Sequence, residues 1–342
     1  MARLRSGARN RRELAQAFGV GFVIGLAALA LLMATHGQPG SLRRTSQGPS
    51  LPVVAEPSGR VPVQAGTIPE RTVFRMKDPP GDDNGPGTYV YPTDETFVPG
   101  LFDLTDFAVR TAGDQVYFDL TFREVNNPWG APEGFYHQLI DIYIDTVPGR
   151  GSTEPLRPGP QVRFHPAHAW DVRVRAAPFG GTRLHRATDP PDAAGRTRGV
   201  SAHVLDDGRT IRIAVAQAAI GAPERSWRYY VLVGGFDAFG EDNYRPVDVQ
   251  PTAWRFGGGD PAAAGPRVID ILAPRWPRSQ AGQLASFAER GDGLGDSGRV
   301  SYALVHPVGP GQNAWVVAAG FLTAAGIAGV WLVRRSRGTR SS

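Results

Sequence analysis

An alternation of apolar and polar side chains with a period of two, repeated between residues 70 and 274, restricts the fold of this chain more than any other feature. Successive side chains of a β-strand point to opposite faces, so each such run places one apolar row against a core. Clusters of Gly, Pro and Asp separate the runs. The pattern predicts an all-β fold, an antiparallel β-sandwich. The clearest runs are residues 116–122, 139–145, 172–175, 211–215 and 230–233.

Two short signals refine this prediction. The sequence Asp206-Asp207-Gly208 separates two alternating runs and predicts a tight hairpin turn. Residues 217–220 form the one short helix-like segment of the region. Between residues 70 and 274 the sequence contains no GxGxxG motif, no P-loop and no βαβ rhythm, which argues against nucleotide chemistry in this region.

Two long apolar runs lie outside the alternating region. Residues 17–34 and 314–333 contain no charged side chain over 18 and 20 positions. Because a helix needs about 20 apolar residues to cross a bilayer core, we expect one N-terminal transmembrane α-helix or signal anchor at 14–35 and one C-terminal transmembrane α-helix at 314–333. For the first run a cleavable signal peptide is the alternative, although the run is long and lacks a clear small-residue cleavage site.

The positive charge of the chain is concentrated at its two ends. The net charge is +5, but residues 1–13 and residues 334–342 each carry a net +4, which leaves the part between them at −3. Positive charge beside a membrane span marks the cytoplasmic side. We therefore expect both termini in the cytoplasm and the folded part on the extracytoplasmic side of the cell membrane. An acidic folded part also argues against a nucleic-acid partner.

Glycine, proline and serine mark the remaining boundaries. They make up 15 of the 33 positions from 37 to 69, too many for a segment that packs a core of its own. A glycine-punctuated polar segment also follows the alternating region. The expected order is a basic tail at 1–13, a span at 14–35, a flexible linker at 36–69, the β-sandwich at 70–274, a linker at 275–313, a span at 314–333 and a basic tail at 334–342.

An acidic loop precedes the first clear strand. Between residues 78 and 94, carboxylate and amide side chains stand among glycines and prolines, and hard cations such as Ca²⁺ prefer such oxygen ligands. The spacing is not that of an EF-hand, because the twelfth position counted from Asp78 or from Asp82 is not a glutamate. From spacing alone a calcium loop and a solvated turn, in which Asp and Asn bond the local backbone, remain equal alternatives.

Several motifs that occur in order along the chain resemble one known family. They are GDDNGPGTYVYPTD, FVPGLFDLTDFAV, NNPWGAPEGF, IDIYID, AWDVRV, WRYYVLVGGFDAFGEDNYRPV, WRFGGGD and VIDIL. Together they are similar to the C-terminal binding module of glucodextranases, a module also found in pullulanase-like and other surface proteins and described as similar to S-layer-associated modules. The resemblance covers about residues 70–274 and neither apolar run.

The resemblance implies a β-sandwich related to DOMON-like, jelly-roll and carbohydrate-binding folds. It implies binding of a glycan or cell-wall polymer rather than bond cleavage, so the chain is not expected to be an enzyme. The acidic loop is similar to the opening motif of the family, which implies a structural Ca²⁺ held by Asp78, Asp82, Asp83 and Asn84.

Sugar binding also has a physical signature, because the apolar face of a sugar stacks on exposed aromatic rings while its hydroxyls pair with amides, carboxylates and arginine. Trp129 is the first candidate platform, since Pro and Gly flank it in a loop. Trp170, Tyr143, Trp227 and Trp254 are further candidates, although most Trp residues of a sandwich belong to its core. A second candidate ligand-binding loop carries Asp237, Asp242, Asn243 and Arg245, with a well-capped turn as the alternative.

Other chemistries find little support in the sequence. The chain has no cysteine, which excludes disulfides, thiolate metal sites and a cysteine nucleophile. No G-x-S-x-G motif occurs, and no spacing nominates the carboxylate pair of a glycosidase. His165 and His168 have a metal-ligand spacing, but beside Pro166 a solvated pair is the simpler interpretation.

Two functional hypotheses follow. The first is a membrane-anchored, non-catalytic module that binds glycan or cell-wall polysaccharide. The second is a structural or assembly protein of the cell envelope whose sandwich contacts another protein. An exposed aromatic platform with polar neighbours would favour the first, and a broad apolar patch would favour the second.

Overall fold

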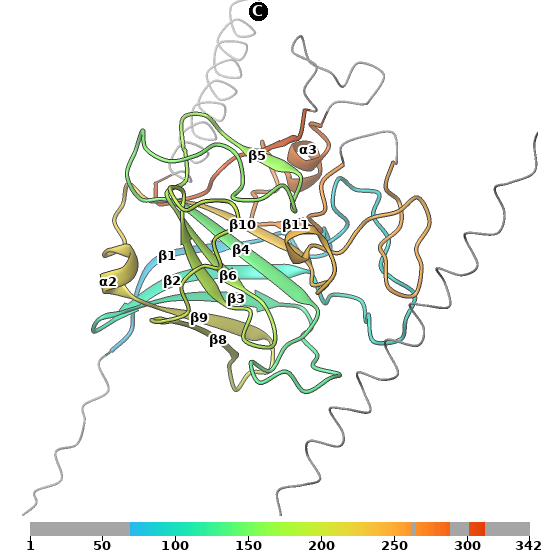
Figure 1. The fold of residues 1–342 in the computed structure, drawn as a ribbon, viewed down its shortest axis with the longest axis horizontal. Coiled ribbons are helices and arrows are strands. Elements are labelled where there is room, and N and C mark those ends of the chain that lie inside the picture. The colour runs from blue at the N-terminus through green and yellow to red at the C-terminus, as the bar shows by residue number, and fades with distance from the viewer. Residues whose placement is uncertain (1–68, 261–264, 288–300, 312–342) are drawn as a thin grey trace, which may run out of the picture. The chain divides into compact units, whose positions relative to one another are not determined.

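A computed structural model describes residues 69–260, 265–287 and 301–311. Two five-stranded sheets dominate this part of the chain (Figure 1). The first sheet has the order β1-β2-β3-β9-β8 and the second β11-β10-β4-β6-β7, and all pairs within both are antiparallel. The fold is therefore the all-β antiparallel sandwich expected from the alternation.

The strands of the first sheet are β1 (Arg71–Lys77), β2 (Leu104–Ala112), β3 (Gln115–Phe122), β8 (Val200–Val204) and β9 (Thr210–Ala216). Those of the second are β4 (Gln138–Asp145), β6 (Val172–Ala176), β7 (Arg183–Arg186), β10 (Arg228–Gly235) and β11 (Asp270–Ile271). A short parallel pair joins β5 (Val162–Phe164) to β12 (Ala303–Val305). The helical segments are α2 (Gln217–Ile220), the 3₁₀ turn η1 (Glu241–Asn243) and α3 (Gln280–Leu284).

The main core lies between the two sheets and consists of the apolar rows that the alternation predicts. The Phe107 ring lies 6.3 Å from that of Phe118 within the first sheet and 5.8 Å from that of Tyr229 on β10 of the second, centroid to centroid. Each such side chain stabilises the fold by about 1.5–3 kcal/mol when fully removed from water. The hairpin predicted at 206–208 joins β8 to β9, and Gly208 takes a left-handed φ of 70° in its turn.

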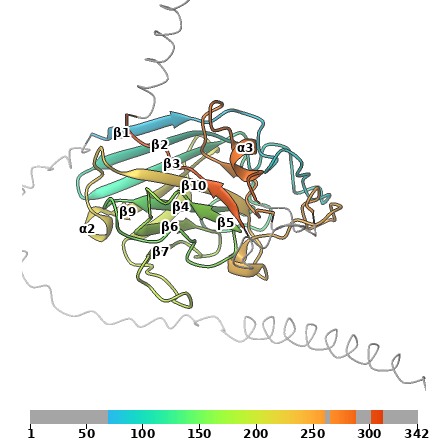
Figure 2. The same cartoon turned by 90° about the horizontal axis from the view of Figure 1, so that it is seen from above.

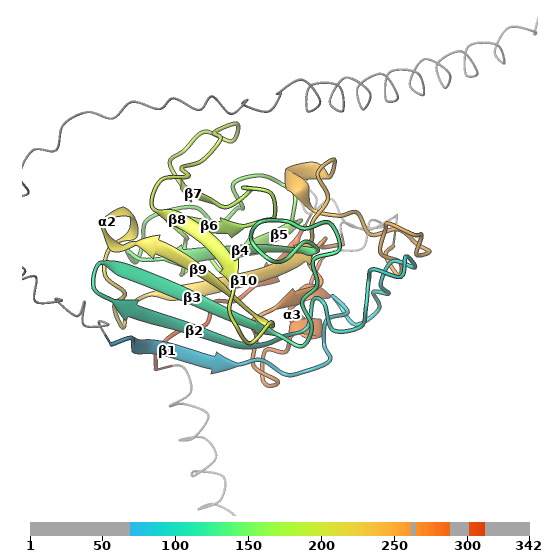
Figure 3. The same cartoon turned by 90° about the horizontal axis from the view of Figure 1, so that it is seen from below.

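A second core covers the other face of the second sheet. Tyr143 of β4 packs there against Phe164 of β5 and Trp170, and Leu284 of α3 and Val305 of β12 belong to the same cluster. In Figure 1 the layers follow one another from the first sheet through β4 and β10 to β5 and α3. Figure 2 looks along this stack from the side of β5, and Figure 3 looks along it from the side of the first sheet. Every residue of β4 is consequently buried, including its polar row.

The segment 275–313, expected to be a linker, contributes α3 and β12 to the described fold. Its apolar residues are sparse among glycines and polar side chains, but Leu284, Ala303 and Val305 are each buried in the second core. They close the outer face of the second sheet, a role that local composition does not reveal.

Within the described residues, no helix has the length and apolar character needed to cross a membrane. The runs predicted as spans, at 14–35 and 314–333, lie outside the described residues, as do both basic tails and nearly all of the linker at 36–69.

Candidate functional site

Six aromatic side chains gather at one end of the sandwich and form what we call the aromatic surface. Trp129 and Trp254 are each 44% exposed, and their ring centroids lie 5.8 Å apart at an angle of 48°. Tyr136 lies 4.2 Å from Trp129 and 5.9 Å from Phe179, which is 54% exposed. The full set is Phe97, Trp129, Tyr136, Phe179, Phe236 and Trp254, all from loops at the ends of strands.

The Trp129 loop is held by its own asparagine. Asn127 accepts a hydrogen bond from the backbone N–H of Ala131 at 2.7 Å and donates one to the Ala131 carbonyl at 2.8 Å. These two hydrogen bonds close a turn that carries Trp129 at its tip. Gly130 supplies the left-handed φ of 65° that the turn requires. The turn therefore presents the Trp129 ring to solvent in a fixed position.

Arg245 lies beneath the aromatic surface and is only 5% exposed. Its guanidinium sits 5.2 Å from the centroid of the Phe97 ring and donates hydrogen bonds to the carbonyls of Trp254 and Phe236. Arg245 therefore fixes the two loops that carry these aromatic residues.

The neighbouring His137 is also buried beneath the surface, with its ring 5.6 Å from that of Trp129. Burial, and then the charge of Arg245, lowers the pKa of His137 to about 4. At neutral pH the surface therefore rests on a neutral imidazole and on one buried cation.

The other predicted ligand-binding residues occupy the loop around η1. Asp237 accepts a hydrogen bond from the Phe239 N–H at 3.0 Å, so it caps the turn, and Phe239 itself is 96% exposed. Asp242 and Asn243 both have left-handed φ values, of 47° and 62°. Asn243 accepts the backbone bond of Asp237 at 2.9 Å through its carbonyl.

The Asp242 side chain is buried in an ion network. It accepts hydrogen bonds of 2.7 Å from Arg173 and 2.9 Å from Arg175, and both arginines also bind Asp141 on β4. Burial alone would raise the pKa of Asp141, but the two guanidinium groups hold it well below its usual range. Asp242 thus fixes η1 to the second sheet, and its carboxylate is directed inward.

The structure brings Trp129, Trp254 and Arg245 together and separates them from the remaining aromatic candidates. Trp170, Tyr143 and Trp227 are buried in the two cores, as most sandwich aromatics are. Phe179 and Tyr136 join the aromatic surface without having been singled out in the sequence. Only the pairing of β4 with β6 and β10 brings their loops together, so no local pattern identifies them.

A second group of polar side chains forms a buried carboxylate cluster. One oxygen from each of Asp78, Asp82 and Asp270 lies within 4.8 Å of the others. Within the described residues, no other group of three acidic or histidine side chains comes as close. Asp103 adds a fourth negative charge, since its field acts on both Asp78 and Asp82.

Each of these four carboxylates has one buried oxygen without a hydrogen-bond partner. The other oxygens of Asp78, Asp103 and Asp270 accept backbone N–H bonds of 2.7–2.9 Å from Ala273, Gly81 and Leu104, which fix the carboxylates in place. An unpartnered buried oxygen is costly, and a cation bound between Asp78, Asp82 and Asp270 would remove that cost for these three carboxylates. The donor set therefore fits a hard cation.

The pKa values in the cluster respond to this crowding. Burial, together with the charges of Asp82 and Asp103, raises the pKa of Asp78 to about 9. Burial, followed by the charge of Asp103, raises the pKa of Asp82 to about 6. Burial and the neighbouring charges of Asp78 and Asp82 raise the pKa of Asp270 well above its usual range.

Asp83 and Asn84, the other two residues of the predicted calcium set, make different contacts. Asp83 accepts a hydrogen bond from the Tyr91 hydroxyl. The Asn84 carbonyl accepts backbone bonds from Gly87 at 3.0 Å and Tyr89 at 2.9 Å, which shape the loop. Neither belongs to the three-carboxylate group, which instead includes Asp270 from β11.

A family model described as the C-terminal binding-module, SLH-like, of glucodextranase matches residues 73–294. A solved structure of a carbohydrate binding module family 9 from Caldicellulosiruptor kristjanssonii, in complex with cellotriose, is 14% identical. That alignment covers 53% of this chain and 84% of the other, with a TM-score of 0.24. No curated protein matches the chain.

Proposed function

This chain belongs to the family of SLH-like C-terminal binding modules of glucodextranase, and from that membership we propose that it is a non-catalytic module that binds glycan or cell-wall polysaccharide through its aromatic surface. The observation that carries the proposal is the exposed pair of Trp129 and Trp254, fixed by Asn127 and Arg245. Two rings at 48° give an angled platform against which the apolar face of a sugar can stack.

Polar groups border this platform as a sugar site requires. Glu133 accepts hydrogen bonds from the N–H groups of Phe179, at 2.9 Å, and Gly180, which ties that loop to the Trp129 loop. Asp237 and Asn243 are half-buried on the loop that follows Phe236. Carboxylate and amide groups beside exposed aromatic rings are the combination typical of ligand sites with a few orienting polar contacts.

The experiment is a pull-down of the detergent-purified full-length chain with insoluble polysaccharides and purified cell wall. Trp129→Ala and Trp254→Ala should each weaken binding about two- to twelvefold, because a stacking contact contributes about 0.5–1.5 kcal/mol. Trp276→Ala is the matched control, since Trp276 is 71% exposed but lies outside the aromatic surface. Glycan binding that is unchanged in both test variants would contradict the aromatic surface as the site, and capture of an envelope protein without glycan would support the assembly hypothesis instead.

We also propose that Ca²⁺ occupies the carboxylate cluster and stabilises the fold. Asp78, Asp82 and Asp270 would hold it, each through the oxygen that has no hydrogen-bond partner, and Asp103 would add a nearby carboxylate. Ca²⁺ accepts six to eight oxygen ligands and neutralises carboxylates that otherwise repel each other. The support is the set of orphaned oxygens and the raised pKa values of the four acids.

Thermal melting with calcium or with a chelator tests this proposal. Calcium should raise the melting midpoint of the full-length chain by mass action. Asp270→Asn should abolish that increase and raise the midpoint of the metal-free chain, because a neutral amide avoids the cost of placing an ionisable carboxyl group in the buried cluster. Asp83→Asn should retain the calcium effect, which separates the cluster from the loop residues. Equal midpoints with calcium and with chelator would contradict the proposal.

Membrane anchoring is the third part of the proposed function. It rests on the apolar runs at 17–34 and 314–333 and on the arginines that flank them. Because the chain has no cysteine, single cysteines report topology without background. In intact cells an impermeant maleimide should label Asp206→Cys, on the exposed β8–β9 hairpin, and should label Ser341→Cys only after lysis. Labelling of Ser341→Cys in intact cells would reverse the proposed topology.

A further inference from the structure

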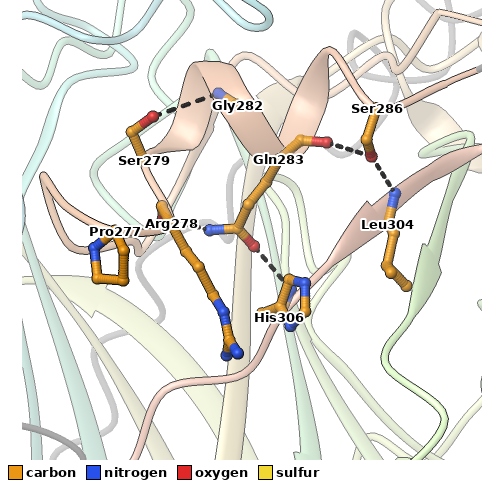
Figure 4. A pocket seen from close by; sticks show the side chains of 8 residues that line it. All are labelled: Pro277, Arg278, Ser279, Gly282, Gln283, Ser286, Leu304 and His306. Atoms are coloured by element: carbon orange, nitrogen blue, oxygen red, sulfur yellow. Dashed lines mark hydrogen bonds between the residues drawn. The ribbon is translucent and has the colours of Figure 1, made fainter. Parts of the chain in front are cut away.

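A pocket of about 220 Å³ lies beside α3 and β12, and the proposed function makes no use of it. Figure 4 shows that its walls come from the segment before α3, from α3 itself and from β12 with the residue after it. The lining residues are Pro277, Arg278, Ser279, Gly282, Gln283, Ser286, Leu304 and His306.

Most polar groups of the pocket bind one another. The side-chain amide of Gln283 donates a hydrogen bond to the Arg278 carbonyl at 2.7 Å and accepts one from the backbone N–H of His306 at 2.7 Å. The Ser286 hydroxyl donates to the Gln283 carbonyl and accepts from the Leu304 N–H (Figure 4). These bonds make the pocket wall rigid and leave two groups for a ligand, the Arg278 guanidinium and the His306 ring.

Neither of these two groups is satisfied by the part of the chain that the structure describes. Nδ1 of His306 is buried without a hydrogen-bond partner. The Arg278 guanidinium forms no ion pair among the described residues, although its charge reaches both His306 and His165. In Figure 4 the Arg278 and His306 side chains extend to the same side of α3.

The surroundings of these groups are basic. The His165 ring lies 4.8 Å from that of His306 and 6.0 Å from that of His168. Burial, then Arg278 and the two other histidines, lowers the pKa of His306 to about 4. Among the described residues, the carboxylate that contacts these histidines belongs to Asp145, and it already pairs with Nδ1 of His168 at 3.2 Å. An anion is the ligand that would relieve this accumulation of positive and potentially positive charge.

We propose that this pocket binds an oxyanion, the carboxylate or phosphate group of an acidic ligand, between the Arg278 guanidinium and the imidazole rings of His306 and His165. A guanidinium offers two parallel N–H donors that match a carboxylate or a phosphate. The imidazole nitrogen of His306 supplies a further donor when protonated. The site shares no residue with the aromatic surface or the carboxylate cluster, so it goes beyond the proposed function and can fail or succeed independently of it.

Anion binding and histidine protonation are coupled in this arrangement. A bound negative charge favours the protonated ring and therefore raises the pKa of His306 and His165. Binding then takes up protons, so the affinity increases as the pH falls. Asp145 opposes this effect only through His168, whose ring it already engages.

Sulfate is the first probe, because its charge stays constant across the relevant pH range. The detergent-purified full-length chain, labelled with ¹³C at histidine Cε1, is titrated at constant ionic strength at about pH 5.5 and about pH 7.5, on either side of the ordinary histidine pKa of about 6.5. The His306 and His165 signals should shift saturably and at lower sulfate concentration at the lower pH. His203, which is exposed on β8, serves as the internal control.

Matched arginine variants identify the site. Arg278→Gln should weaken sulfate binding about tenfold, whereas Arg209→Gln, on the exposed β8–β9 hairpin, should leave it unchanged. An unchanged His137 signal shows that Arg278→Gln is folded. Equal binding by wild type and Arg278→Gln, or a His203 shift as large as that of His306, would overturn the proposal.

Competition then identifies the source of the anion. Glucuronate displaces sulfate if the site accepts a sugar carboxylate, and glycerol phosphate displaces it if the site accepts a phosphate ester. Either result supports an oxyanion site for an acidic ligand. Failure of both compounds to displace sulfate would contradict it.

Discussion

Two acidic residues of one loop show how differently neighbouring side chains contribute. Asp237 and Asp242 lie five positions apart, and the sequence predicts both as ligand-binding residues. Asp237 caps its own turn, whereas the Asp242 side chain is buried between Arg173 and Arg175. The difference arises because η1 folds back over β6, which brings Asp242 against Arg173 and Arg175. The spacing of residues along the chain does not predict this contact.

This contrast gives a prediction about stability. Asp242→Ala leaves Arg173 and Arg175 in the interior with an uncompensated charge, and breaking such a buried network typically costs about 3–5 kcal/mol. Asp237→Ala, the control in the same loop, removes one turn-capping bond and should cost about 1 kcal/mol. Denaturant unfolding of the calcium-saturated full-length chain measures both. Equal losses for the two variants would mean that the network contributes no more than a capped turn.

At the scale of elements, the alternation predicts five strands of the two sheets but misses several others, including the nine-residue β2 between β1 and β3. The five predicted runs fall within β3, β4, β6, β9 and β10 and differ from them by at most two residues at either end. The alternation does not identify β1, because a bulge between Thr72 and Phe74 interrupts its period of two. β5 and β12 have three residues each and form only because segments far apart in the sequence meet.

The residues of the candidate sites, like the strands, are only partly predictable from the sequence. Trp129 is identifiable because Pro and Gly flank it in a loop, and the loop around Asp78 and Asp82 is identifiable by composition. Neither flanking residues nor local composition identifies Asp270, since it belongs to a strand of only two residues that pairs with β10. A local pattern can therefore nominate one wall of a site, while the opposite wall depends on the topology of the sheets.

At the scale of the whole molecule, two sets of buried groups give stability opposite dependences on pH. The pKa of Asp78 is raised to about 9, so the metal-free fold should lose stability as the pH rises from about 4 towards that value. Burial lowers the pKa of His137 and of His185 to about 4. Because the unfolded chain protonates these histidines first, stability should also fall as the pH decreases from about 6.5 to 4.

Between about pH 4 and 6.5 the two dependences oppose each other, and above about pH 6.5 only that of the carboxylates remains, so the melting midpoint of the metal-free chain should fall as the pH rises from about 6.5 to 9. Saturating calcium replaces the protons of the carboxylate cluster, so it should remove the alkaline decline and leave the acidic one. Melting curves across this pH range, with calcium and with chelator, measure the effect. A calcium increment that is the same at every pH would contradict this coupling.

The backbone pairing of Val308 with Tyr229 has a mechanical consequence. The two residues exchange hydrogen bonds of 2.8 and 2.9 Å shortly after β12 ends, and Tyr229 belongs to β10, which pairs with β4 on one side and β11 on the other. If residues 314–333 anchor the chain and the module binds a polymer, as we propose, tension between the membrane and that polymer would first reach the described fold near Val308. The two hydrogen bonds between Val308 and Tyr229 would carry this force first, and they attach the end of the described chain to an interior strand of the second sheet.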